Sequence, residues 1–112
     1  MTDQPTPAPE VDLDTLAAAL AEGAPLIDVR TPDEYAQVRV PGARLIPLDQ
    51  LGTRTDEVPK DCRVYVICAV GGRSMAAATA LKNAGWDTVN VAGGTNRWAE
   101  EGRPTESGPA AG

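Results

Sequence analysis

Apolar positions along the chain switch between helical and extended spacing, with short polar connections between the two. Leucine and alanine recur at helical intervals over 13–20, which predicts a first helix that ends at Gly23 in a left-handed conformation. The run PLIDV (25–29) predicts a short buried strand. RVYVI (63–67) predicts a central strand, because an apolar run without alternation is typical of strands covered on both faces.

Capping residues indicate where further elements begin. Thr31 starts a capping box that Glu34 completes, and Pro32 suits the first position of a helix, so a helix is expected directly after the first strand. A short strand is expected within PGARLIPL (41–48). The segment 49–59 is mostly polar and is expected to be a loop with one helical turn.

The second half of the chain repeats the alternation of strand and helix. SMAAATALKNA (74–84) predicts an alanine-rich helix that stops at Gly85, and 87–91 predicts a last strand. We expect Thr95 to cap a short helix that carries Trp98. Together these elements predict an α/β fold with a small, mostly parallel sheet of about five strands and helices on both faces.

The composition of the two ends differs from that of the middle. Residues 1–10 contain three prolines and no apolar periodicity, and residues 103–112 are equally poor in core-forming side chains. We therefore expect one folded domain over 11–102, a disordered N-terminal tail and a C-terminal tail, within a length that suits a single core.

The charge of the chain excludes several partners. Ten basic and sixteen acidic residues give a formal charge of −6, and no stripe of lysine and arginine is present for nucleic acid or anionic lipid. No run of apolar residues is long enough for a membrane helix, and the N-terminus lacks the basic start and apolar run of a secretory signal. The expected compartment is the cytoplasm.

Cysteine and histidine usage narrows the chemistry. The strand expected between Cys62 and Cys68 would hold their Cα atoms about 20 Å apart, which is too far for a disulfide. The chain contains no histidine, so catalytic Cys-His pairs and histidine metal sites are excluded. We expect no metal and no organic cofactor.

Cys68 is the candidate nucleophile. It ends the central strand and is followed by Gly71, Gly72 and a helix, and this arrangement places backbone N–H groups and a helix N-terminus around the sulfur. Such surroundings favour the thiolate without a histidine. Gly71 and Gly72 are expected to supply the backbone angles of a tight turn. Arg73 would pair either with a bound anion or with a neighbouring carboxylate, and the sequence leaves both open.

An ordinary structural interpretation of each cysteine stands beside the catalytic one. Free cysteine is often buried, so Cys68 would then be a core residue that ends a strand before a glycine turn. Cys62 has no glycine-rich loop after it, and we expect it to be structural or incidental.

Four stretches, in this order and at these intervals, resemble the single-domain rhodaneses: LIDVRTPDEY (26–35), VPGARLIPL (40–48), VYVICAVGGRS (64–74) and NVAGGTNRWAEEGRP (90–104). The family motifs fall on Asp28-Val29-Arg30 with Glu34, on Cys68, Gly71, Arg73 and Ser74, and on Gly93, Gly94 and Trp98.

The resemblance implies a sulfurtransferase. Cys68 would take a sulfane sulfur from thiosulfate or a persulfide and pass it to a thiophilic acceptor such as cyanide, a thiol (of a small molecule or a protein) or sulfite. The loop Ala69, Val70, Gly71, Gly72, Arg73 and Ser74 would stabilise the persulfide. Arg30 and Glu34 are expected to form a structural ion pair below the site, and Asp28 is expected to brace the loop.

Two departures from the family pattern bear on the substrate. Arg39 stands where many relatives have a histidine, and we expect a surface change there, with a substrate contact as the alternative. Ala69 and Val70 are apolar where several thiosulfate-using members have a basic residue, so a persulfide donor is at least as plausible as the thiosulfate dianion.

Two other functions remain as alternatives. Phosphatases and arsenate reductases of the same fold place five residues between the cysteine and the arginine, whereas four separate Cys68 from Arg73 here, which makes a smaller bowl. A non-catalytic binding or regulatory module is the second alternative, although this chain has kept the cysteine that many such modules lack. The sequence leaves the donor, the acceptor and the oligomeric state open.

Overall fold

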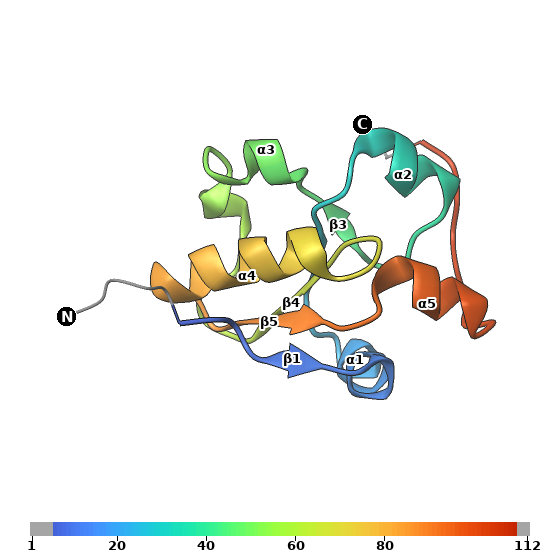
Figure 1. Cartoon of the computed structure of the whole chain (residues 1–112), viewed down its shortest axis with the longest axis horizontal. Coiled ribbons are helices and arrows are strands. Elements are labelled where there is room, and N and C mark those ends of the chain that lie inside the picture. Colours follow the sequence, from blue (N-terminus) through green and yellow to red (C-terminus); the bar gives the residue numbers. More distant parts are fainter. Residues whose placement is uncertain (1–5, 110–112) are drawn as a thin grey trace.

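The computed structural model describes residues 6–109, in which a parallel sheet lies between two layers of helices (Figure 1). In chain order the elements are β1 (Glu10–Val11), α1 (Leu13–Ala21), β2 (Leu26–Asp28), α2 (Pro32–Gln37), β3 (Arg44–Leu45), α3 (Leu48–Leu51), a 3₁₀ turn (Thr55–Glu57), β4 (Val64–Ile67), α4 (Gly72–Asn83), β5 (Thr88–Val91) and α5 (Gly94–Glu100).

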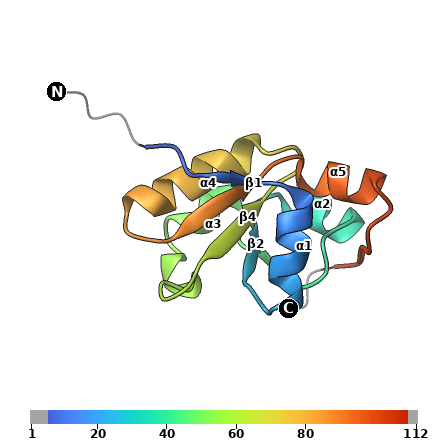
Figure 2. The same cartoon turned by 90° about the horizontal axis from the view of Figure 1, so that it is seen from below.

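The sheet has five strands in the order β1-β5-β4-β2-β3, and every neighbouring pair is parallel. The predicted α/β class and the central place of β4 are confirmed. Because all strands point the same way, the loops that follow β2, β4 and β5 leave from the same end of the sheet, where the strands finish (Figure 2). The fold places the candidate site at this carboxyl end of the strands.

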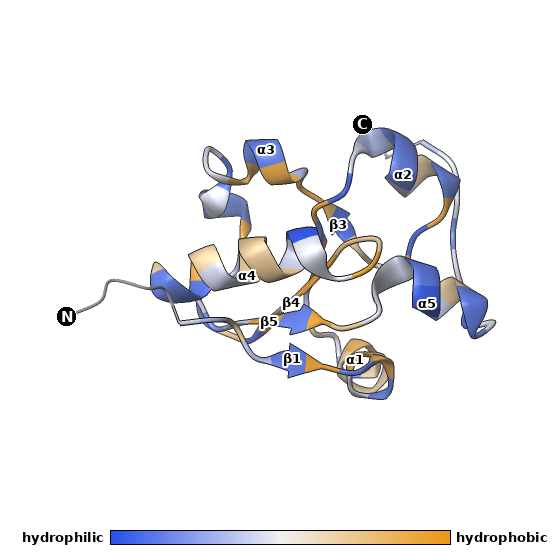
Figure 3. Cartoon of the chain, viewed as in Figure 1, coloured by the Kyte–Doolittle hydropathy of each residue, from blue (hydrophilic) through white to orange (hydrophobic). Residues whose placement is uncertain are grey.

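Apolar side chains cover both faces of the sheet. In Figure 3 the strands are mixed in colour, with hydrophilic positions on β1, β3 and β5 and hydrophobic positions at the ends of β1 and β5. Helices α3 and α4 cover one face, with a core of Ala8, Ile27, Val29, Ile46, Leu51, Val58, Val64, Val66, Cys68, Ala77, Ala78 and Leu81. Helices α1, α2 and α5 contribute Leu13, Leu16, Tyr35 and Trp98 to the core of the other face. Four residues of β4 are buried in a row, because the strand contacts helices on both sides.

Local capping forms where the sequence predicts it. Gly23 ends the turn after α1 with φ of 87°, and the capping box of α2 is complete because Thr31 and Glu34 bond each other's backbone N–H. After α4, Gly85 adopts φ of 110° and the amide of Trp86 donates to the carbonyl of Leu81, which is the Schellman arrangement.

The expected start of α5 is wrong by two residues. Gly93, with φ of 86°, occupies the N-cap position, and Thr95 lies inside the helix. Its backbone amide donates to the carbonyl of Cys68 at 2.8 Å, while its side-chain hydroxyl is buried without a hydrogen-bond partner. Because Gly93 adopts this left-handed conformation, α5 begins at Gly94, two residues before the start that a cap by Thr95 would give. Likewise α4 starts at Gly72, and the segment after β3 contains both α3 and a 3₁₀ turn.

The packed chain extends beyond the boundaries expected at 11 and 102. Ala8 is buried, the carbonyl of Pro9 accepts a hydrogen bond from the amide of Asn90 at 2.8 Å, and β1 pairs with β5 at the sheet edge. The tail assignments for residues 1–5 and 110–112 lie outside the described residues. Among the helices of the described part, none is long and apolar enough to cross a membrane.

Arg39 holds the C-terminal segment, so the expectation of a neutral surface position is wrong. Its guanidinium donates to the carbonyls of Tyr35 at 3.1 Å and Gly108 at 2.7 Å, and it stacks on the Tyr35 ring. The backbone of Arg39 also pairs with that of Glu106. Anchors of this kind order a segment that has little apolar surface of its own.

Candidate functional site

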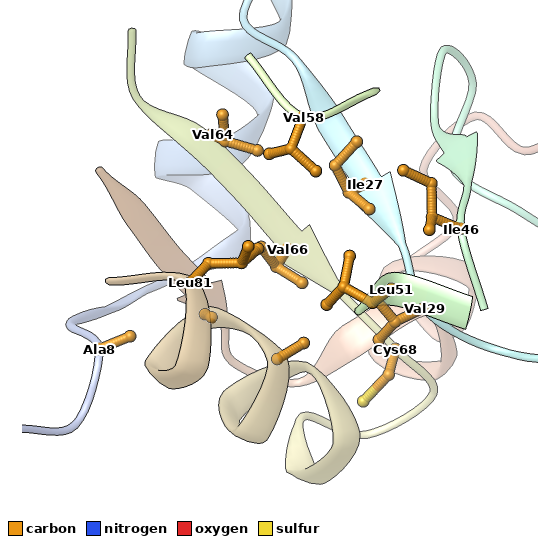
Figure 4. Packing of buried hydrophobic residues seen from close by; sticks show 12 residues of the cluster. Ala8, Ile27, Val29, Ile46, Leu51, Val58, Val64, Val66, Cys68 and Leu81 are labelled. Atoms are coloured by element: carbon orange, nitrogen blue, oxygen red, sulfur yellow. The ribbon is translucent and has the colours of Figure 1, made fainter. Parts of the chain in front are cut away.

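Cys68 follows β4 and continues the row of side chains that faces α4 (Figure 4). In that row Val64 and Val66 pack beneath the helix, and the Cys68 sulfur points toward the loop that leads into it. A strand alternates its side chains between the two faces of the sheet, which is why Cys68 shares the face of Val64 and Val66.

The loop after Cys68 closes over its sulfur. The backbone N–H of Gly71 donates to Cys68 Sγ at 3.0 Å, and the hydroxyl of Ser74 lies 3.2 Å from the same atom. Gly71 has φ of 114°, a left-handed conformation in which a side chain is strained. Gly72 does not have a positive φ, so the expectation of special backbone angles holds for Gly71 alone.

These donors change the acidity of the thiol. Burial raises the pKa of Cys68, but the Ser74 hydroxyl and the amides of Ser74, Gly71 and Val70 together stabilise the thiolate more strongly. The pKa therefore lies below its ordinary value. The N-terminal end of α4, with its partial positive charge, faces the same sulfur. The predicted activation of the thiol without histidine has a structural basis in these contacts.

The sulfur is enclosed as well as activated. Cys68 is 1% exposed, whereas Val70 at the tip of the loop is 69% exposed. The loop thus presents its amides inward to the sulfur and an apolar side chain outward to solvent.

Arg73 is tied to a carboxylate, which is one of the two roles left open by the sequence. Its two terminal nitrogens donate to the two oxygens of Glu34 at 2.7 and 2.8 Å. The Arg73 guanidinium lowers the pKa of Glu34 to about 2, and Glu34 in turn raises the pKa of Arg73. This bidentate pair fastens the loop to α2.

Arg30 does not pair with the Glu34 side chain, so the expected ion pair is wrong. Its guanidinium makes a bidentate contact with Asp28, at 3.0 Å from Nε and 2.7 Å from Nη2, and both side chains are almost fully buried. Nη2 also donates to the carbonyl of Val38 at 2.7 Å. Asp28 is the partner because it lies two residues away, at the end of β2. Through Arg30 the end of β2 is therefore linked to Val38, the residue that follows α2.

The N-terminus of α5 supports the loop from another side, a contribution that the sequence did not reveal. The amides of Thr95 and Asn96 donate to the carbonyls of Cys68 and Ala69 at 2.8 and 3.1 Å. Gly94 permits this approach, because a Cβ there would lie 2.7 Å from the Cys68 carbonyl oxygen. The double glycine in the sequence was the available signal.

Two further polar residues reach the site and were also missed. The Ser74 hydroxyl makes a short hydrogen bond with Oδ1 of Asn90, which is fully buried in β5. Nδ2 of Asn90 donates to Oε2 of Glu10 at 2.8 Å. A polar residue within the buried strand TVNV was the sequence signal for a specific hydrogen-bond partner.

The remaining candidate residues lie elsewhere or do not form a site. Cys62 is exposed and free. It lines a hollow together with Thr15 and Tyr65, remote from the loop that follows Cys68. Among the described residues, no three His, Cys, Asp or Glu side chains group as ligands for a metal ion.

A hollow of about 430 Å³ opens beside the loop. Arg73, Arg30, Leu48 and Asp49 are among its lining residues. Leu48, at 37%, and Val70 are the exposed large hydrophobic side chains in the described part of the chain. The surroundings of the loop therefore combine paired charges with apolar surface.

Comparison with known proteins agrees with this geometry. The rhodanese-like domain family matches residues 12–101. A sulfurtransferase of Allochromatium vinosum is 39% identical over 98 residues, which are 85% of this chain and 92% of that protein. A rhodanese-related protein of Thermoplasma volcanium has a TM-score of 0.82 at 31% identity, covering 88% of this chain and 97% of that chain.

Further matches have the same fold in different settings. A rhodanese-like domain protein of Staphylococcus aureus has a TM-score of 0.79 at 35% identity, covering 88% of this chain and 97% of that chain. The adenylyltransferase and sulfurtransferase uba4 of Ogataea parapolymorpha is much longer, and the match spans 22% of its length. The chain therefore belongs to the rhodanese-like domain family of sulfurtransferases.

Proposed function

We propose that this chain moves a sulfane sulfur from a persulfide or thiosulfate donor to a thiophilic acceptor through a persulfide on Cys68. The observation that carries the proposal is the convergence of the Gly71 amide and the Ser74 hydroxyl on the Cys68 sulfur. Donors placed around one sulfur stabilise the attacking thiolate, and they also suit the negative charge of a persulfide.

The reaction proceeds in two displacements. The Cys68 thiolate attacks the outer sulfur of the donor, a new S–S bond forms, and the bond to the inner sulfur of the donor breaks. The bonding electron pair leaves with the donor residue, which is a thiolate from an organic persulfide or sulfite from thiosulfate. The acceptor then attacks the terminal sulfur of the Cys68 persulfide, and Cys68 is released as a thiolate.

The charges near the loop favour an organic persulfide over thiosulfate. Both terminal nitrogens of Arg73 are engaged by Glu34, so its positive charge is compensated. Asp49 adds a negative charge to the adjoining hollow, and the exposed tip of the loop is Val70. A dianion gains little in such surroundings, whereas an uncharged or singly charged persulfide loses little.

A non-catalytic module is the second candidate, and one observation favours it. Cys68 is 1% exposed, and a sulfur that stays covered does not react with a donor. The proposed activity requires the loop between Cys68 and Ser74 to widen for the incoming sulfur. The phosphatase alternative is disfavoured, because only four residues separate Cys68 from Arg73 and the Arg73 charge is already compensated by Glu34.

Intact-mass measurement tests the proposal. The protein is incubated with cysteamine persulfide, whose ammonium and persulfide groups give no net charge, and, separately, with thiosulfate, and the expected product carries one additional sulfur atom. The Cys62→Ser variant should still gain the sulfur and Cys68→Ser should not, which assigns the position. If neither donor adds sulfur to the native chain, the non-catalytic module is the better description.

The same assay tests the donor preference. We expect more complete labelling by the organic persulfide than by thiosulfate at equal concentration. Val70→Arg places an uncompensated positive charge at the exposed tip of the loop, so it should raise labelling by thiosulfate selectively. Equal labelling of the native chain by both donors would contradict the electrostatic argument while leaving the persulfide mechanism intact.

A further inference from the structure

A chain of polar side chains runs from the reactive sulfur to the edge of the sheet. Cys68 Sγ lies 3.2 Å from the hydroxyl of Ser74, and this hydroxyl contacts Oδ1 of Asn90. The other end of the Asn90 amide donates to Oε2 of Glu10 at 2.8 Å. Glu10 and Asn90 are register partners in the parallel strands β1 and β5, so their side chains lie next to each other on the α4 face.

The available protons determine which group donates in each of these hydrogen bonds. A carboxylate only accepts hydrogen bonds, so ionised Glu10 requires the NH₂ group of Asn90 to face it. The Asn90 oxygen then faces Ser74 and competes for the single hydroxyl proton. Ser74 therefore cannot donate to Asn90 and to the Cys68 sulfur at the same time.

The two protonation states of Cys68 need opposite settings of this chain. When Cys68 is a thiol, its S–H can donate to Ser74, Ser74 donates to Asn90, and Asn90 donates to Glu10, so each group has a partner. When Cys68 is a thiolate, Ser74 must turn its proton to the sulfur. Asn90 then loses its donor unless its amide rotates, and rotation breaks the bond to Glu10.

We propose that Asn90 and Glu10 are positioning residues that act on Cys68 through the orientation of the Ser74 hydroxyl, with Glu10 holding the setting that favours the thiol. This inference deepens the proposed sulfurtransferase function and rests on it, because the same hydroxyl would face the persulfide. The burial of Asn90 supports a specific role, since a fully buried amide is costly unless its hydrogen bonds are made.

Glu10→Gln tests the role of the outer residue. A glutamine amide either donates or accepts, so Asn90 can then turn its NH₂ group to Ser74, and Ser74 can donate to the sulfur. The Cys68 thiolate should become easier to form. Ser74→Ala removes the hydroxyl through which Glu10 would act, so it should abolish the effect of Glu10→Gln.

The charged groups that face Cys68 from other elements are unchanged in these variants. Arg73, which interacts electrostatically with Cys68, remains paired with Glu34, and the buried pair of Asp28 and Arg30 stays in place. Glu10→Gln does remove one negative charge, and this alone would favour the thiolate. The experiment must therefore separate a direct charge effect from the hydrogen-bond chain.

The thiolate fraction is measured by ultraviolet titration in a Cys62→Ser background, because this method requires no reagent to enter the closed loop. The comparison of Glu10→Gln with and without the Ser74 hydroxyl makes the separation. Below the titration midpoint, Glu10→Gln should raise the thiolate fraction about three- to tenfold, the range of one ordinary intramolecular hydrogen bond. In the Ser74→Ala background, Glu10→Gln should have almost no effect. Glu22→Gln, an exposed glutamate at the end of α1, is the matched control for charge and should leave the titration unchanged.

The outcomes decide the inference separately from the proposed function. An equal effect of Glu10→Gln with and without the Ser74 hydroxyl indicates charge alone and overturns the inference, as does no effect in the native background. If Glu10→Gln does not fold, Asn90→Val removes the competing acceptor and should shift the thiolate fraction in the same direction. If no sulfur is added to the protein but the effect of Glu10→Gln still depends on Ser74, the proposed sulfurtransferase function is overturned and the inference about the hydrogen bonds is not.

Discussion

Replacing Gly94 by alanine should disrupt the support of the active loop more than any ordinary glycine substitution. The new Cβ would lie 2.6 Å from the Ala69 carbonyl carbon and 2.7 Å from the Cys68 carbonyl oxygen. Both contacts are with backbone, which cannot rotate away as a side chain can. Gly94 also has φ of 64°, so alanine is strained there before any clash is considered.

The expected loss of stability follows from these two effects. A left-handed conformation costs a residue with a Cβ about 1–2 kcal/mol. Overpacking against rigid neighbours costs about 1–3 kcal/mol. The two hydrogen bonds from the start of α5 to the loop weaken as the backbones separate. We therefore expect a loss of about 2–5 kcal/mol, a large share of the roughly 5–15 kcal/mol that stabilises a typical domain.

Urea unfolding followed by tryptophan fluorescence measures this loss, since Trp98 lies buried in α5. Two other glycines provide matched controls. Gly102 has φ of 73°, and a methyl group added there would have no neighbour within 4 Å, so Gly102→Ala should cost about 1–2 kcal/mol from strain alone. Gly52 has neither a positive φ nor a neighbour within 4 Å, and Gly52→Ala should change stability by no more than about 1 kcal/mol.

The order of the three variants is the decisive result. If Gly94→Ala is no less stable than Gly102→Ala, the close approach of α5 to the active loop is not a stabilising feature of the protein. A measured loss confined to the strain value would mean that the loop backbone relaxes without cost.

Three further predictions concern other parts of the structure. Arg39→Ala should cost about 1–2 kcal/mol in urea unfolding and speed amide exchange near Gly108, because two guanidinium hydrogen bonds are lost; unchanged exchange would show that the segment is held by other contacts. Thr95→Val should be neutral or stabilising by up to about 1 kcal/mol in the same assay, since it removes a buried hydroxyl without a partner, and a clear loss would indicate a partner for that hydroxyl. Arg73 depresses the pKa of Glu34 to about 2 from an ordinary 4.5, so this carboxylate stabilises the fold above 4.5 and the contribution is lost as the pH falls toward 2. The urea midpoint is therefore measured at pH 4.5 and near pH 2, and its decrease between them should be smaller for Glu34→Gln than for the native protein. An equal decrease in both proteins would contradict the pairing.

Much of the fold follows from signals a few residues long. The capping box at Thr31, the glycine stops at Gly23 and Gly85, and the unbroken apolar run of β4 each depend on neighbouring residues, so they can be recognised without the rest of the structure. The glycine turn after Cys68 belongs to the same group. Its amides curl around the sulfur because the turn is local to the cysteine.

The tertiary structure decided which side chains meet. Arg73 pairs with Glu34 across 39 positions of sequence, and Asn90 with Glu10 across 80, whereas the family resemblance had led us to expect Arg30 as the partner of Glu34. The burial of Cys68 likewise depends on how the loop, α4 and α5 pack together. A helix cap needs only the next turn of the chain, but an ion pair or a buried amide needs a partner that the folded sheet brings within about 3 Å.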